Sequence, residues 1–276
     1  MKGPGELTVW GLQRSCAWED VAANIADVDT WLQRQAASTP SRPDLIVLPE
    51  MWNSGFSMHP ERFAEPWHPD APTLRAMSQW ATEYGAAVVG SWAVESPSGF
   101  RNRLGFVPPT AEGEPTFYDK YHRFSPAQEH LRFDGPLSPE AARVVVAWRG
   151  WRLRLIVCYD LRFPVFCRWT PDFPYDALVC VACWPSVRIH AWRTLLQARA
   201  IENQCAVIGI NRVGTDGLGH VHCGQSALVD TWGTPLAQLP EHQAGWLTAS
   251  FDGSAQTRFR NQLPFLGDAD SFQFLA

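Results

Sequence analysis

Three residues whose side chains suit nucleophilic hydrolysis follow apolar runs of this sequence: Glu50, Lys120 and Cys158. A thiol can attack a carbonyl carbon, and a neighbouring carboxylate can take the thiol proton and return it to a leaving amine. An ammonium group can stabilise the oxyanion that develops. The three residues therefore indicate amide hydrolysis if the fold brings them together. An ordinary ion pair between Glu50 and Lys120 is the alternative.

The segment around Cys158 predicts how its thiol is presented. Apart from Arg154, residues 153–157 are leucine or β-branched, which is typical of a buried strand, and Pro164 suits the first turn of a helix. We therefore expect a strand, a sharp turn at Cys158 and then a helix. Unpaired N–H groups at a helix N-terminus favour a thiolate, so the thiol should be reactive. A buried structural cysteine is the alternative.

The elements that must position these residues alternate between strand and helix. Short apolar runs predict strands, and apolar residues at helical spacing predict helices. The predicted strands are residues 7–12, 44–48, 86–92, 103–108, 115–121, 143–148, 151–157, 176–183, 206–213, 226–230 and 246–251, and the predicted helices are residues 18–35, 70–84 and 187–204.

This many strands requires two sheets or one very large sheet. Because helices are interleaved along the whole chain, two sheets packed face to face and covered outside by helices would bury every apolar face. We therefore predict an α/β protein, a four-layer α-β-β-α sandwich of two mixed sheets. No Ser/Gly-rich linker divides the sequence, so residues 1–276 are expected to form a single domain.

The composition excludes several classes of protein. Hydrophobic residues make up 46% of the chain and the net charge is -5, which predicts a packed globular protein without affinity for nucleic acid or an anionic membrane. Neither a signal-peptide core nor a run of 18 apolar residues is present. The seven irregularly spaced cysteines are typical of reduced thiols, so we expect a cytoplasmic protein.

One long connection contains candidate functional residues. Residues 124–140 hold three prolines and a glycine and show no helical or strand period. A loop of this length in a compact domain is usually functional or mobile. Glu129 and His130 lie within it.

Five ordered sequence blocks closely resemble the nitrilase superfamily of carbon–nitrogen hydrolases. The first three are the catalytic blocks of that family. The blocks are residues 45–50 (LIVLPE), 118–120 (YDK), 156–164 (IVCYDLRFP), 198–204 (ARAIENQ) and 211–214 (NRVG). The segment around Cys158 and residues 55–58 (GFSM) most resemble the omega-amidase branch, whose members hydrolyse the terminal amide of short dicarboxylic acid monoamides such as 2-oxoglutaramate.

The resemblance implies a role for each candidate. Cys158 would be the nucleophile and Glu50 the general base and acid. Lys120 and the backbone N–H of Tyr159 would stabilise the tetrahedral intermediate, and Glu129 would orient Lys120 and the nucleophile. No metal or organic cofactor is expected. The resemblance also implies a homodimer or larger homo-oligomer.

Two further residues are candidates for substrate binding. Arg162 matches the family position whose guanidinium meets the distal carboxylate of the substrate, a task that suits a planar bidentate donor. A surface arginine paired with Asp160 or Glu202 is the alternative. Trp184 follows a predicted strand and is expected to form an apolar wall of the pocket, although an aromatic residue at that position could belong to the core.

The sequence departs from the family pattern at two positions near the catalytic blocks. Trp52 is bulkier than the family residue, and His122 is displaced after Lys120. These differences leave other substrates open: a deaminated-glutathione amidase, an aliphatic amidase or a nitrilase. A catalytically silent member that binds a small molecule or acts as a scaffold is a further alternative.

Two pairs of potential metal ligands are weaker signals. Cys180 and Cys183 are spaced three residues apart on a predicted strand, where their side chains would face opposite sides and could not share a metal. His220 and His222 share a strand face but have no evident third ligand, so we interpret them as loop histidines.

Overall fold

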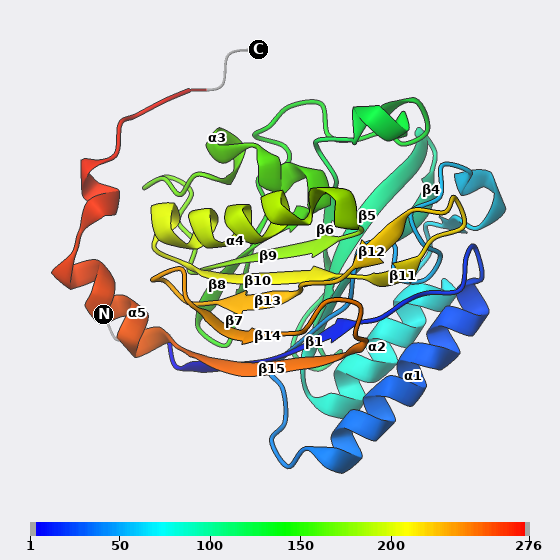
Figure 1. Ribbon diagram of the computed structural model, residues 1–276, viewed down its shortest axis with the longest axis horizontal. Coiled ribbons are helices and arrows are strands. Elements are labelled where there is room, and N and C mark those ends of the chain that lie inside the picture. Colours follow the sequence, from blue (N-terminus) through cyan, green and yellow to red (C-terminus); the bar gives the residue numbers. More distant parts are fainter. Residues whose placement is uncertain (1–3, 274–276) are drawn as a thin grey trace.

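Two β-sheets lie face to face in the computed structural model, which describes residues 4–273 (Figure 1). In order, the first sheet contains β15 (Gly245–Asp252), β1 (Glu6–Gln13), β2 (Leu45–Val47), β4 (Ala87–Ser96), β5 (Gly99–Val107) and β6 (Thr116–Asp119), with β3 (Glu65–Pro66) beside β4. The second contains β14 (Pro235–Gln238), β13 (Ala227–Val229), β10 (Ala206–Asn211), β9 (Ala177–Ala182), β8 (Trp151–Val157) and β7 (Val145–Trp148).

Each sheet has a parallel centre and antiparallel flanks. Strands β1, β2 and β4 run parallel in the first sheet, and β8, β9 and β10 run parallel in the second. Residues beyond the carboxyl ends of parallel strands form the usual ligand crevice of an α/β protein. Glu50 follows β2 and Cys158 follows β8, so each sheet contributes one of them from its parallel centre.

Alternation along the strands produces the four layers. Val9 and Leu45 belong to the core between the sheets, whereas their neighbours Trp10 and Ile46 pack with helices on the outer face. These helices are α1 (Val21–Ser38) and α2 (Pro72–Tyr84), which lie side by side in Figure 1. Helix α4 (Ile189–Asn203) covers the second sheet. The predicted four-layer sandwich is confirmed.

The two sheets approach each other closely at Gly11. A Cβ atom added there would lie 2.3 Å from Cδ1 of Ile210, which belongs to the opposite sheet. Any side chain on residue 11 would therefore force Ile210 or the sheets to move. Glycine at this position permits the close packing of the core.

Several short or polar elements were not predicted from the sequence. They are strand β14, the hairpin of β11 (Val213–Thr215) and β12 (Val221–Cys223), and helix α5 (Gly253–Gln262). Helix α5 lacks a strong apolar period and begins instead at a cap, since Asp252 accepts hydrogen bonds from the N–H groups of Ser254 and Ala255. Among residues 4–273, no helix is long and apolar enough to cross a membrane.

Candidate active site

Cys158 occupies a strained turn directly after strand β8. Its backbone φ is +45°, in the left-handed region that non-glycine residues rarely adopt. A 3₁₀ turn, Cys158–Arg162, leads into the short helix α3 (Pro164–Cys167), as the sequence predicted. Strained backbone of this kind is concentrated at functional sites. The turn exposes Cys158 partly to a pocket.

The buried carboxylate of Asp160 fixes this turn. Its oxygens accept hydrogen bonds from the N–H of Val157 at 2.9 Å, the hydroxyl of Tyr118 at 2.6 Å and the N–H of His122 at 2.9 Å. The ring Nδ1 of His122 also lies 2.8 Å from Asp160. Asp160 thereby links the turn of Cys158 in one sheet to the end of strand β6 in the other.

Lys120, Glu50 and Glu129 form a buried ionic cluster. The Nζ atom of Lys120 lies 2.8 Å from Oε1 of Glu50 and 3.0 and 2.8 Å from the two carboxylate oxygens of Glu129. All three side chains are at most 1% exposed. Lys120 is also the only lysine among residues 4–273. The structure therefore brings together the three charged residues that the sequence singled out.

Two further groups donate hydrogen bonds to the carboxylates of Glu50 and Glu129, and neither was predicted from the sequence. The side-chain Nδ2 of Asn102 donates to Oε1 of Glu50 at 2.9 Å and to Oε1 of Glu129 at 3.1 Å. The backbone N–H of Cys183 donates to Oε2 of Glu50 at 2.8 Å. Asn102 lies within strand β5, where asparagine is unfavourable, and this unusual placement was a signal that the sequence offered.

The long loop predicted to be functional supplies Glu129. Short 3₁₀ turns at Ser125–Ala127 and Glu129–Leu131 order it, and the N–H of Phe124 donates to Oε2 of Glu129 at 2.6 Å. Phe56, from the segment that follows Glu50, places its ring 5.0 Å from the Nζ of Lys120. Both residues contact the cluster, whose side chains are buried.

The charges in the cluster control the protonation of the site. Burial opposes the charged form of Lys120, but the carboxylates of Glu129 and Glu50 outweigh burial and raise the pKa of Lys120 well above its usual range. Burial, followed by the charge of Glu50, raises the pKa of the Cys158 thiol well above its usual range. The expectation of a favoured thiolate is therefore wrong for the resting site, because burial and Glu50 outweigh the effect of the turn.

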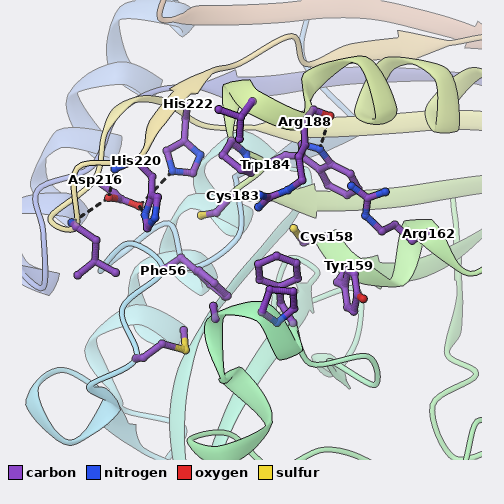
Figure 2. Close-up of a pocket in the computed structure, with 17 residues that line it drawn as sticks. Phe56, Cys158, Tyr159, Arg162, Cys183, Trp184, Arg188, Asp216, His220 and His222 are labelled. Carbon is purple, nitrogen blue, oxygen red and sulfur yellow. Dashed lines mark hydrogen bonds and ion pairs between the residues drawn. The ribbon is translucent and has the colours of Figure 1, made fainter.

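A pocket of about 300 Å³ opens over Cys158 (Figure 2). This volume is at the small end of the range for ligand sites. The pocket is lined by Phe56, Met58, Phe124, Pro126, Ala127, Cys158, Tyr159, Arg162, Cys183, Trp184, Pro185, Val187, Arg188, Asp216, Leu218, His220 and His222.

Arg162 and Trp184 both line this pocket, as predicted. The guanidinium carbon of Arg162 lies 4.7 Å from the centre of the Trp184 ring. The alternative pairing of Arg162 with Asp160 or Glu202 is contradicted, because Asp160 is bonded elsewhere and Glu202 pairs with other arginines. Arg162 therefore has no carboxylate partner among the described residues.

The sequence block at residues 211–214 positions Trp184. Asn211 accepts a hydrogen bond from the N–H of Trp184 at 2.7 Å and donates to the carbonyls of Trp184 at 3.0 Å and Gly224 at 2.7 Å. The indole N–H of Trp184 donates to the carbonyl of Arg188 at 2.9 Å. Hydrogen bonds at both ends therefore fix the pocket wall that Trp184 forms.

The histidines that the sequence placed in a loop, His220 and His222, line the pocket. His222 belongs to strand β12, is 3% exposed and lies 3.3 Å from the carboxylate of Asp216, which His220 also approaches at 3.2 Å. The interpretation of His222 as a loop histidine was wrong, because the short hairpin β11–β12 has too few apolar residues to show a strand period. No three His, Cys, Asp or Glu side chains within residues 4–273 are arranged to hold a metal ion.

The two departures from the family pattern lie outside the pocket lining. Trp52 is buried on the helix side of the first sheet, where its ring lies 5.5 Å from that of Trp80. His122 contacts Asp160 and stacks on Phe163 at 3.7 Å. Neither residue narrows the space above Cys158.

Comparison with known proteins gives the same family throughout the chain. The family model for carbon-nitrogen hydrolase matches residues 8–260. The chain is 41% identical to "Omega-amidase YafV" of Escherichia coli over 98% of its own length and 99% of the relative. It is 28% identical to a "2-oxoglutaramate amidase" of Bacillus subtilis over 95% of this chain and 96% of that protein.

Solved structures agree with these sequence relatives. A CN-hydrolase superfamily protein of Xanthomonas campestris, solved with an arsenic adduct in its active site, is 38% identical and superposes with a TM-score of 0.89 over 98% of this chain and 99% of that chain. Saccharomyces cerevisiae Nit3, of the nitrilase superfamily, shares the fold with a TM-score of 0.84 at 21% identity over 96% of each chain. The chain thus belongs to the carbon–nitrogen hydrolase family.

Proposed function

We propose that this protein is an omega-amidase, which hydrolyses the terminal amide of a small carboxylated amide such as 2-oxoglutaramate to release ammonia. The observation that carries the proposal is the buried Glu50–Lys120–Glu129 cluster, whose charges act on the Cys158 thiol, together with the small pocket that exposes Cys158 and the unpaired Arg162. The relatives named as omega-amidase and 2-oxoglutaramate amidase support the choice of substrate.

In the first step, Glu50 removes the proton of the Cys158 thiol while the sulfur attacks the amide carbonyl carbon. The raised pKa of Cys158 makes such a base necessary, since little thiolate exists before substrate binds. A carbon–sulfur bond forms and the carbonyl π-electrons move to oxygen. The ammonium of Lys120 and the backbone N–H of Tyr159 stabilise that oxyanion.

Collapse of the tetrahedral intermediate breaks the carbon–nitrogen bond. Glu50 returns the proton to the nitrogen, ammonia leaves and a thioester remains on Cys158. Glu50 then takes a proton from a water molecule that attacks the thioester carbon. The carbon–sulfur bond breaks, the thiol regains its proton and the carboxylic acid is released. Glu129 and Asn102 keep Lys120 and Glu50 in position throughout.

Arg162 selects substrates that carry a carboxylate at the end opposite the amide. Its guanidinium rests on Trp184 and has no carboxylate of the described protein to bind. A bidentate hydrogen bond to a substrate carboxylate would satisfy it. A substrate lacking that carboxylate would leave Arg162 unpaired in the pocket and should therefore bind less well.

Ammonia release across a set of amides tests this proposal. The set contains 2-oxoglutaramate, succinamate, deaminated glutathione, an uncharged aliphatic amide and a simple nitrile. We expect turnover of the first two, together with a thioester mass on Cys158 after rapid quenching. Inactivity on both would reject the omega-amidase assignment, and preferred turnover of another member would identify the alternative amidase or nitrilase. Unchanged hydrolysis by Cys158→Ala would reject the nucleophile.

We also propose that the enzyme forms a homodimer or larger homo-oligomer in the cytoplasm. Ile201 on helix α4 and Trp232 in the turn before β14 are 55% and 60% exposed and lie on one surface, because Gly233 approaches Ile201 closely. An exposed apolar surface of this kind supports association. Sedimentation of wild type and Trp232→Glu tests the oligomer, and only a monomeric wild type would reject it.

The seven cysteines are unpaired, which supports a reducing compartment such as the cytoplasm.

A further inference from the structure

Two guanidinium groups without anionic partners lie in the same pocket. Arg162 comes from the turn after Cys158, and Arg188 comes from the connection between β9 and α4. Neither forms an ion pair with a carboxylate among residues 4–273. Figure 2 shows both side chains on the same side of Cys158 as Trp184.

Aromatic rings hold the faces of both guanidiniums and leave their edges free. Arg162 lies over Trp184 at 4.7 Å, and Arg188 lies over Phe124 at 5.1 Å. A stacked guanidinium keeps its in-plane N–H donors available for hydrogen bonds. Trp184 also donates its indole N–H to the carbonyl of Arg188, so one residue supports both arginines.

The charges of the site favour an anionic substrate at these two arginines. The inner cluster has one excess negative charge when Glu50 and Glu129 are ionised and Lys120 is protonated, which by itself would repel an anion. Arg162 and Arg188 place two positive charges in the outer pocket, and the only carboxylate among the described residues that line it, Asp216, lies beside the rings of His220 and His222. Burial and then the charge of Arg162 lower the pKa of Arg188, and a bound anion would relieve the repulsion between the two cations.

One carboxylate does not use both guanidiniums fully. A single guanidinium can bind the two oxygens of a carboxylate in bidentate fashion. A second guanidinium that enters the same space therefore has donors for another acceptor oxygen of the substrate. In a 2-oxo acid, the keto oxygen lies directly beside the carboxylate and provides such an acceptor.

We propose that Arg188 is a second substrate-binding residue, which recognises the 2-oxo oxygen beside the carboxylate bound by Arg162 and so selects 2-oxo acid monoamides over unsubstituted ones. This inference rests on the proposed omega-amidase function for the identity of the reacting group. By this inference, Arg188 alone distinguishes a 2-oxo acid monoamide from the monoamide that has the same carbon chain but no oxo group.

Turnover of 2-oxoglutaramate and glutaramate, which differ only by the oxo group, tests the discrimination. Arg188→Gln should lower kcat/KM for 2-oxoglutaramate about ten- to a hundredfold, as expected for one hydrogen bond to a charged donor, mainly through KM. The loss for glutaramate should be at least several times smaller. Arg188→Lys, which keeps the charge but not the fork, should recover only part of the preference. If part of a substrate is cyclised in solution, that part is the same for every enzyme. It therefore cancels when the kcat/KM values of variant and wild type on that substrate are compared.

A matched control separates this effect from a general loss of positive charge. Arg193 lies on helix α4, which begins directly after Arg188. Its side chain is exposed and pairs with Glu241 at 3.8 Å outside the pocket. Arg193→Gln should keep the wild-type ratio of the two substrates. If Arg188→Gln lowered kcat/KM by the same factor for both substrates, or lowered it for neither, the inference would be overturned.

A binding measurement distinguishes failure of this inference from failure of the proposed function. In the Cys158→Ala background, calorimetry with the products 2-oxoglutarate and glutarate needs no turnover. We expect 2-oxoglutarate to bind more tightly and Arg188→Gln to remove at least most of that difference. A wild type that hydrolyses neither amide would reject the proposed function, whereas a binding preference that survives Arg188→Gln would reject the role of Arg188.

Discussion

The hydroxyl of Tyr118 donates a 2.6 Å hydrogen bond to Oδ2 of Asp160, and this contact joins the two halves of the active site. Tyr118 precedes Lys120 at the end of β6 in the first sheet, and Asp160 lies in the turn that begins at Cys158 in the second. The position of the ammonium relative to the thiol therefore depends on a side-chain contact as well as on the packing of the sheets.

Tyr118→Phe removes this contact while keeping the aromatic ring. Loss of a buried hydrogen bond to a carboxylate should lower the free energy of unfolding by about 1.5–3 kcal/mol. The turnover number should fall as well, because the segments that carry Lys120 and Cys158 lose one of the contacts between them. Urea unfolding and steady-state kinetics measure the two effects. Tyr175→Phe is a control, since its buried hydroxyl bonds to the carbonyl of Cys167 away from the pocket. An equal loss of kcat in both variants would contradict the prediction.

Asn102→Asp places a third carboxyl beside Glu50 and Glu129. Asn102 now donates to both of them, so the new carboxylate would repel each and compete for Lys120. We expect kcat at neutral pH to fall by roughly a hundredfold or more, as is typical when preorganised charge at a reacting centre is disturbed. Lowering the pH should restore part of the activity, because protonation of the added carboxyl removes the repulsion.

The pH profile of kcat measures this effect, with Asn102→Leu as the control of similar shape. Asn102→Leu loses the hydrogen bonds but adds no charge, so its activity should not rise as the pH falls. If the two variants had the same pH profile, repulsion would not explain the loss.

The reactivity of Cys158 toward iodoacetamide should report the charges around it. Burial and Glu50 raise the pKa of this thiol, whereas Lys120 lowers it. Glu50→Gln should therefore shift the pH midpoint of alkylation downward even though turnover is lost. Lys120→Met should shift the midpoint upward. Mass spectrometry of the Cys158 peptide separates its labelling from that of the half-buried Cys16. Movement of both midpoints in one direction would refute this electrostatic account.

Gly11→Ala should destabilise the fold by about 1–3 kcal/mol through overpacking. The added methyl group would meet Cδ1 of Ile210 at 2.3 Å in the space between the sheets. Gly245→Ala, on the neighbouring strand β15, provides the comparison because its nearest neighbour would lie at 3.6 Å. Denaturant unfolding should leave that control within about 0.5 kcal/mol of wild type. A similar stability of the two variants would show that the sheets can separate at little cost.

The parts of this molecule that follow from apolar periodicity were predictable. Apolar runs such as residues 153–157 predicted the strands of both sheets. They also predicted that Glu50, Lys120 and Cys158 lie at strand ends. Helix α5 and the β11–β12 hairpin were missed, because their sequences are short or polar and are held by caps and tertiary contacts. His222 was consequently assigned to a loop.

The residues that tune the site depend on distances across the fold. Asn102 bridges carboxylates that stand 52 and 27 positions away in sequence, and no spacing rule connects them. Arg188 follows Trp184 by one short turn, yet only the folded pocket shows that it shares a space with Arg162. The raised pKa of Cys158 likewise depends on burial and on the charge of Glu50, which a strand-to-helix pattern does not show.

The chain contains only two lysines, and Lys120 is the one within residues 4–273. Protein prepared with ¹⁵Nζ-lysine would therefore show just two side-chain nitrogen resonances. Comparison with Lys120→Met assigns the resonance of the buried ammonium, whose protons are held by Glu50 and Glu129. Titration with substrates, products and acid would then report the protonation and the surroundings of the Lys120 Nζ atom through a single resonance.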